Sequence, residues 1–176
     1  MNVFETTYPS NRNQNPYGTC WAVASTGLAE FDLINDSLAG RGSFDRSLDL
    51  SELQLAYFTY NSVVDPLGGT EGDYTKYYNE NASVSYLNYG GNYAMAARRL
   101  AQWCGAVPES LVPYSQAAAT VTGGLDSSYA YSHDVAHLEN IYMVNIRENA
   151  SDVKQQIMEH GAVGVMYYHA DTAMGW

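Results

Sequence analysis

The sequence predicts an α+β fold in which helices come first along the chain and strands follow. Apolar residues recur at helical spacing from Cys20 to Leu38, which predicts a long helix buried along one broad face. Farther on, residues 136–146 have the β-branched and aromatic content of a strand, and residues 162–168 form a nearly continuous apolar strand. Because elements of one kind are grouped together, we expect a helical part of the chain followed by a part that contains sheet.

Two shorter helices are expected between the long helix and the strands. Ser51 and Gln54 form a capping box, which predicts a helix that runs through Tyr57 or Phe58. Residues 92–104 place apolar side chains on one face and are followed by a glycine, as at the C-terminal end of a helix.

A last helix is expected over residues 152–160, with Ser151 as its cap and a glycine after its end. The other segments contain many turn-forming residues. Residues 1–12 are expected to form an extended surface arm, residues 61–88 a long loop or insertion, and residues 115–134 a loop of small and polar residues.

Composition and charge narrow the class of protein. A chain of 176 residues fits one domain, residues 1–176, built as two small lobes. The net charge of -11 argues against a nucleic acid or an anionic membrane as a partner. No segment approaches the roughly 18 apolar residues of a membrane span. A composition rich in Tyr, Asn, Ser and Gly and poor in Lys suggests a secreted or cell-surface bacterial protein.

Cys20 lies where a turn-forming loop becomes the long helix. The loop contains Asn15, Pro16 and Gly18, and Thr19 is placed to cap the helix. A thiol in the first helical turn faces the positive end of the helix dipole, which favours the thiolate that acts as a nucleophile. The backbone amide of Cys20 and the side-chain amide of Gln14 are both placed to donate to an oxyanion.

These residues resemble the papain family of cysteine peptidases. The run Y-G-T-C-W, residues 17–21, is similar to the family signature C-G-[SA]-C-[WY] around the nucleophile, with Tyr17 and Thr19 as the departures. The resemblance implies that Cys20 is the nucleophile, that Gln14 belongs to the oxyanion hole, and that Glu30 is a buried structural glutamate.

The resemblance also implies a two-lobe fold, in which a β-barrel-like sheet lobe faces the helical lobe across a cleft. The helical lobe is expected over about 1–112 and the sheet lobe over about 113–176, with the chain crossing between them at Pro113 and Tyr114.

Substrate-binding residues are expected from the same resemblance. Gly90 and Gly91 match a glycine pair against which an extended polypeptide substrate forms backbone hydrogen bonds, and such close approach needs residues without side chains. Trp21, next to the nucleophile, completes the expected substrate-binding set. Cys104 is interpreted as a buried helix residue, so both cysteines of the chain are expected to be free thiols.

The family's catalytic histidine and asparagine have no match in the sequence. His160 and His169 lie at a suitable distance along the chain, but neither opens an apolar strand as the family's histidine does, and His133 and His137 match no motif. The resemblance therefore implies that a missing C-terminal segment or a partner chain supplies both residues. No cluster of His, Cys and Asp has metal-ligand spacing, so neither a metal nor a cofactor is expected.

The function implied by the resemblance is that of a cysteine endopeptidase, which hydrolyses peptide bonds through a thioester acyl-enzyme on Cys20. One alternative is a catalytically inactive papain-like binding module, or one part of a split enzyme. Another is a thiol hydrolase or transferase that is not a peptidase and uses the same cysteine.

Overall fold

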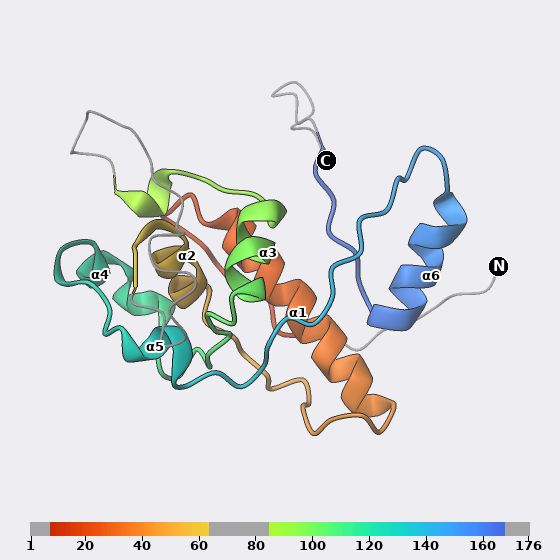
Figure 1. Cartoon of the computed structure of the whole chain (residues 1–176), viewed down its shortest axis with the longest axis horizontal. Helices are drawn as coiled ribbons and strands as arrows, with labels where there is room; N and C mark the ends of the chain where they lie inside the picture. Colours follow the sequence, from red (N-terminus) through yellow and green to blue (C-terminus); the bar gives the residue numbers. More distant parts are fainter. Residues whose placement is uncertain (1–7, 64–84, 168–176) are drawn as a thin grey trace.

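The computed structural model of the chain describes residues 8–63 and 85–167, and three packed helices form its centre (Figure 1). The longest is α1 (Cys20–Leu38), which contacts both α2 (Glu52–Tyr60) and α3 (Tyr93–Ala101). The prediction of a long helix from Cys20 is confirmed, and Ser51 does cap α2, although the Gln54 side chain does not complete the capping box because the Ser51 N–H donates to the Val107 carbonyl instead. The Ser51 hydroxyl accepts a hydrogen bond from the backbone N–H of Gln54 at 3.0 Å.

A cluster of apolar side chains joins the three central helices. Its buried members come from all three, and Tyr60 and Leu100 pack against its edge. Removing these side chains from water is the main stabilising contribution expected for such a bundle. The buried members are Trp21, Ala22, Leu55, Ala56 and Ala96.

Residues 114–131 form short helices, although the sequence predicted a loop over 115–134. Three consecutive alanines, the best helix formers, begin the longest of them. Buried Ala117 and Ala130 then hold these helices against the central bundle. The short helices are η1 (Tyr86–Asn88), η2 (Tyr114–Gln116), α4 (Ala117–Gly123) and α5 (Ser128–Tyr131).

The prediction of an α+β fold with a sheet lobe is wrong. Within the described residues, pairing of the β type is confined to one isolated antiparallel bridge between Leu50 and Pro108. Residues 136–146 and 162–167 lie outside helices and strands. Strand propensity mostly reflects packing against neighbouring strands, and a strand is stable only when its backbone is paired. These segments have apolar side chains suited to a sheet but no partner strand among the described residues.

The last helix, α6 (Ala150–His160), lies apart from the central bundle on the right of Figure 1. Its N-cap is Asn149 rather than the predicted Ser151, while Gly161 follows its end with φ +86° as expected. Its contact with α1 includes an ion pair of 2.6 Å between His160 Nδ1 and Asp32 Oδ1. None of its residues is fully buried, so α6 is held mainly at its end.

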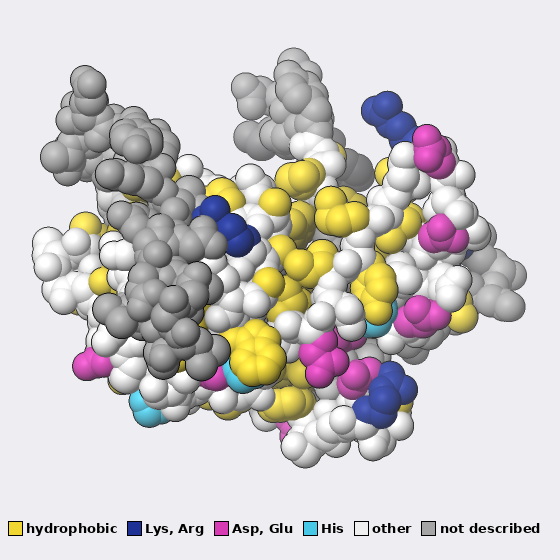
Figure 2. Space-filling model, in the orientation of Figure 1, with side chains coloured by type: hydrophobic (Ala, Val, Ile, Leu, Met, Phe, Trp, Pro, Cys, Tyr) yellow, Lys and Arg dark blue, Asp and Glu magenta, His cyan; other side chains and the backbone are white. Residues whose placement is uncertain are grey.

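Large apolar side chains are exposed along the C-terminal part of the chain. Figure 2 shows hydrophobic side chains gathered across the middle of one face, along the path of the segments before and after α6. Met143 is 89% exposed and Tyr167 is 77% exposed, so these segments add little to the core. Within the predicted insertion 61–88, residues 64–84 lie outside the described residues, as do residues 1–7 of the predicted arm and His169.

Candidate active site

Cys20 is the first residue of α1, and its side chain is exposed. The first backbone N–H groups of a helix have no acceptor within the helix. The Thr19 carbonyl accepts from the N–H of Ala22 at 2.9 Å, but the Thr19 side chain makes no capping hydrogen bond to the earlier N–H groups. An exposed thiol therefore lies beside backbone donors that are suited to an anion. Cys104 is fully buried, and both thiols are free, as expected.

The loop before α1 folds back on itself at Gln14. The N–H of Tyr17 donates to the Gln14 carbonyl at 3.0 Å, and the Gln14 side-chain Nε2 donates to the Tyr17 carbonyl at 3.1 Å. A side-chain amide has two N–H groups, so the second one of Gln14 is available to another acceptor. The half-buried side chain of Gln14 is thus fixed against its own loop.

Tyr114, which sequence reasoning treated only as a point on the connection between the lobes, joins the two ends of this loop. Its hydroxyl donates to the Gln14 carbonyl at 2.7 Å and lies 2.5 Å from Oγ1 of Thr19. Thr19 and Gln14, which lie at the two ends of the loop, therefore both contact the hydroxyl oxygen of Tyr114. The Pro-Tyr pair in the sequence gave no sign of this contact, because it joins residues about a hundred positions apart.

Gly91 lies directly against Trp21. A Cβ at position 91 would come within 2.6 Å of Cγ of the Trp21 ring, so a side chain cannot be placed there without movement. The preceding Gly90 has φ +76°, and its carbonyl accepts a hydrogen bond from the Tyr60 hydroxyl at 2.8 Å. The glycine pair is thus brought to the end of α1 that bears Cys20. Trp21 is 5% exposed, so its ring supports Gly91 from beneath and does not form an open contact surface.

Tyr93 is a second aromatic residue near the thiol. Burial raises the pKa of its phenol, and the negative charge of a Cys20 thiolate raises it further. Its ring also lies against Gly164, where a Cβ would be 2.7 Å from the Tyr93 hydroxyl. The segment after α6 therefore lies against the start of α3, near the end of α1 that bears Cys20.

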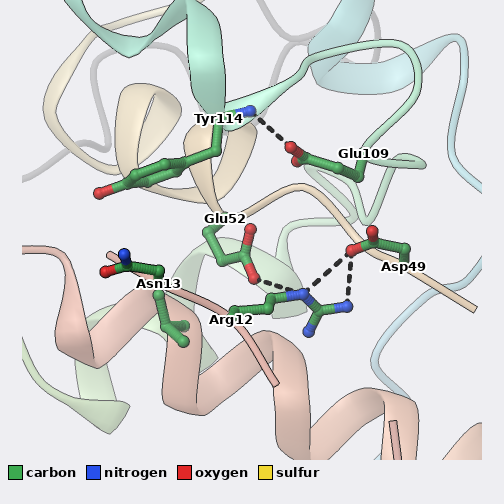
Figure 3. A pocket seen from close by; sticks show the side chains of 7 residues that line it. Arg12, Asn13, Asp49, Glu52, Glu109 and Tyr114 are labelled. Atoms are coloured by element: carbon green, nitrogen blue, oxygen red, sulfur yellow. Dashed lines mark hydrogen bonds and ion pairs between the residues drawn. The ribbon is translucent and has the colours of Figure 1, made fainter. Parts of the chain in front are cut away.

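Arg12 anchors the start of the same loop by a cluster of ion pairs (Figure 3). Its guanidinium binds both carboxylate oxygens of Glu30, at 2.5 and 2.6 Å. It also contacts Asp49 at 2.6 Å and Glu52 at 3.0 Å, beside a cavity of about 190 Å³ whose lining includes Glu109. The sequence placed Glu30 correctly as a buried residue, but it placed Arg12 in a surface arm.

The acidic groups of this cluster outnumber its single cation, which changes their protonation. Burial raises the pKa of Glu52 to about 7, although Arg12 opposes this shift. Burial also raises the pKa of Glu30 and of Glu109. For Arg12, burial lowers the pKa, but the hydrogen bond and charge of Glu30 and the other carboxylates outweigh it, so the net shift is upward. Arg12 therefore stays charged over the pH range in which Glu52 titrates.

The three described histidines lie away from Cys20. His160 pairs with Asp32, which is twelve residues along α1 from Cys20 and thus roughly 18 Å away along the helix axis. His137 stacks on Trp103 with ring centroids 4.5 Å apart, just beyond the end of α3 that is remote from Tyr93. His133 packs against Tyr129 in the group of short helices. None of them is placed to take the proton of the Cys20 thiol.

The described residues contain no group of three or more His, Cys, Asp or Glu side chains arranged to hold a metal ion. In the same part of the chain, every helix is too short or too polar to cross a bilayer.

Comparison with known proteins adds no family assignment. No protein-family model matches the sequence, and no curated protein is similar to it. The geometry around Cys20 is therefore the main indication of a function for this chain.

Proposed function

We propose that this chain carries the nucleophile region of a papain-like cysteine peptidase, with Cys20 as the nucleophile. The observation that supports this most is the meeting of three features at one end of α1. An exposed thiol begins the helix, a loop bearing the Gln14 amide closes onto the residue before it, and Gly91 packs on the residue after it.

In the proposed reaction, the Cys20 thiolate attacks the carbonyl carbon of a peptide bond. The electron pair of the carbonyl moves onto its oxygen, and the Cys20 amide and the Gln14 side chain donate hydrogen bonds to it. Collapse of this intermediate forms the thioester and releases the amine, which takes a proton. Water then attacks the thioester, releases the carboxylic acid and restores the thiol.

A polypeptide substrate would lie extended beside Gly90 and Gly91. Because a Cβ at Gly90 would have nothing within 4 Å, a substrate backbone can approach this glycine closely, while Gly91 is held against Trp21. The acidic chain is proposed to act on polypeptides outside the cell or at its surface, in keeping with its composition.

The general base is proposed to come from outside the described residues, on a further segment of polypeptide or on a partner chain. The positions of His133, His137 and His160 support this assignment, since each lies elsewhere in the fold. Without a base, the leaving amine receives no general-acid help, which is worth about 10² to 10⁴ in rate.

The same observation favours a second candidate function, a papain-like module that binds polypeptides without cleaving them. Such a module would use the glycine pair as a binding edge, and Cys20 would be an unreactive relic of the nucleophile.

A peptidyl chloromethyl ketone tests the two candidates. The full chain is incubated with this reagent at about pH 6, where an ordinary cysteine of pKa about 8.5 carries little thiolate, and intact mass and peptide mapping locate the adduct. We expect alkylation of Cys20 at least about tenfold faster than that of an unstructured cysteine peptide. Cys20→Ser should abolish the adduct, and Cys104→Ser should leave it unchanged, because Cys104 is buried.

Reaction at the rate of the cysteine peptide would count against an activated nucleophile. If peptides still bound with measurable affinity in fluorescence anisotropy, the binding-module function would replace the peptidase.

A further inference from the structure

We propose that Tyr114 is a positioning residue for the oxyanion-binding end of α1, an inference that rests on the proposed function. Its hydroxyl fixes the distance between the loop that bears Gln14 and the helix that begins with Cys20. The chemistry needs those two elements at a set separation, because two donors must reach the same oxygen.

The hydrogen-bond directions around this hydroxyl can be assigned. A phenol has one proton, and the Gln14 carbonyl can only accept, so Tyr114 donates to it at 2.7 Å. The Thr19 hydroxyl, 2.5 Å away, must then donate its own proton to the Tyr114 oxygen. The Thr19 hydroxyl is thereby turned away from the first N–H groups of α1, which agrees with its making no capping hydrogen bond.

Hydrogen bonds fix the backbone of the segment that carries Tyr114. Its backbone N–H donates to Glu109 at 2.6 Å, as Figure 3 shows. The preceding Val112 carbonyl accepts from the Ser51 hydroxyl at 2.6 Å, and Ser51 N–H donates to the Val107 carbonyl at 2.9 Å. The segment that carries Tyr114 is therefore tied to the start of α2, which packs on α1.

The Tyr114 ring adds a second contact with the loop. It packs edge to face against Tyr17, with centroids 6.3 Å apart, so the ring and the hydroxyl act on the same loop. Gly18 has a separate anchor, since its N–H donates to the Asn88 side chain at 3.2 Å. Tyr114 is distinguished by spanning the two ends of the loop rather than its middle.

The test uses Tyr114→Phe, which keeps the ring and removes both hydrogen bonds of the hydroxyl. Two reagents are compared on the full chain. A peptide aldehyde forms a hemithioacetal with Cys20. The sulfur bonds to the aldehyde carbon, the carbonyl electron pair moves to the aldehyde oxygen, and the thiol proton is transferred to that oxygen, which the oxyanion donors bind. Iodoacetamide alkylates the thiol by displacing iodide and forms no oxyanion.

We expect Tyr114→Phe to weaken binding of the peptide aldehyde by about 10-fold to 100-fold, less than the roughly 10² to 10³ lost when an oxyanion donor itself is removed. The rate of iodoacetamide alkylation should change by less than about twofold, because the thiol keeps its place in the first helical turn. Thr19→Val, which removes the other hydroxyl of the pair, should weaken aldehyde binding in the same direction.

The matched control is Tyr86→Phe. Tyr86 also has a half-buried hydroxyl, paired with the Thr120 hydroxyl, but it lies on η1 and contacts α4. Tyr86→Phe should alter stability to an extent similar to Tyr114→Phe and leave aldehyde binding unchanged. Protection of Cys104 from iodoacetamide shows that each variant remains folded.

The outcomes separate the two proposals. If the unaltered chain binds no peptide aldehyde, the proposed function fails, and the role of Tyr114 fails with it. If the unaltered chain binds the aldehyde and Tyr114→Phe binds it equally well, the positioning role alone is overturned. Equal losses in Tyr114→Phe and Tyr86→Phe would also overturn it, because they would indicate a general effect on stability.

Discussion

Replacing Glu52 by Gln should remove a pH-dependent loss of stability. Glu52 is 2% exposed, and burial raises its pKa from the ordinary 4.5 to about 7. Between these two values the folded state keeps a proton that the unfolded chain has released, so stability falls as pH rises. Above pH 7 the full loss in the free energy of unfolding is about 3 kcal/mol, since the pKa rises from 4.5 to about 7 and each pKa unit corresponds to about 1.36 kcal/mol. Glutamine has nearly the same shape as glutamate but cannot ionise.

Urea unfolding at about pH 5 and about pH 8 measures this effect. The unaltered chain should lose roughly 2 kcal/mol more of its free energy of unfolding between these pH values than Glu52→Gln does. Glu148→Gln, at an exposed site, is the matched control and should follow the unaltered chain. An equal loss in the unaltered chain and in Glu52→Gln would refute the reasoning, because the carboxyl that titrates would then lie elsewhere.

Three further predictions concern other contacts described above. Arg12→Met should lower the free energy of unfolding by about 3–5 kcal/mol in urea at about pH 8, because it leaves buried carboxylates without a cation, and by less at about pH 5, where Glu52 is protonated. Gly91→Ala should lower it by about 1–3 kcal/mol in thermal melting, since the added Cβ meets the Trp21 ring, and an unchanged melting temperature would contradict that contact. Iodoacetamide should modify Cys20 alone in the folded chain and both cysteines in urea, because burial raises the pKa of Cys104 to about 12. Mass spectrometry of digested samples measures the modification, and a modified Cys104 in the folded chain would contradict its burial.

The helices around Cys20 were predictable because their signals are local. Apolar spacing marked α1, and Ser51 with Gln54 marked the start of α2, in each case within a few residues of chain. The position of Cys20 in the first turn of its helix followed from the loop before it. Such signals need no knowledge of the rest of the fold.

The sequence-based predictions that were wrong or incomplete concern features that depend on contacts between distant parts of the chain. The β-branched residues of 136–146 predicted a strand, but a strand needs a partner, and the described residues offer none. Arg12 and Tyr114 were missed as parts of the site because their partners lie far away in sequence. Arg12 reaches Asp49 over 37 residues, and Tyr114 reaches Gln14 over 100 residues. No spacing rule in a single sequence reports such pairs.

The attachment of α6 has a consequence for how the molecule opens. The helix has no fully buried residue, and it is joined to α1 chiefly through His160 and Asp32. Amide protons of α6 should therefore exchange with solvent through a local opening that leaves the central bundle closed, whereas those of α1 beside Trp21 should wait for global unfolding. A single melting temperature would describe the bundle and miss the release of α6. A protease could remove the C-terminal part of the chain while the end of α1 that bears Cys20 keeps its structure.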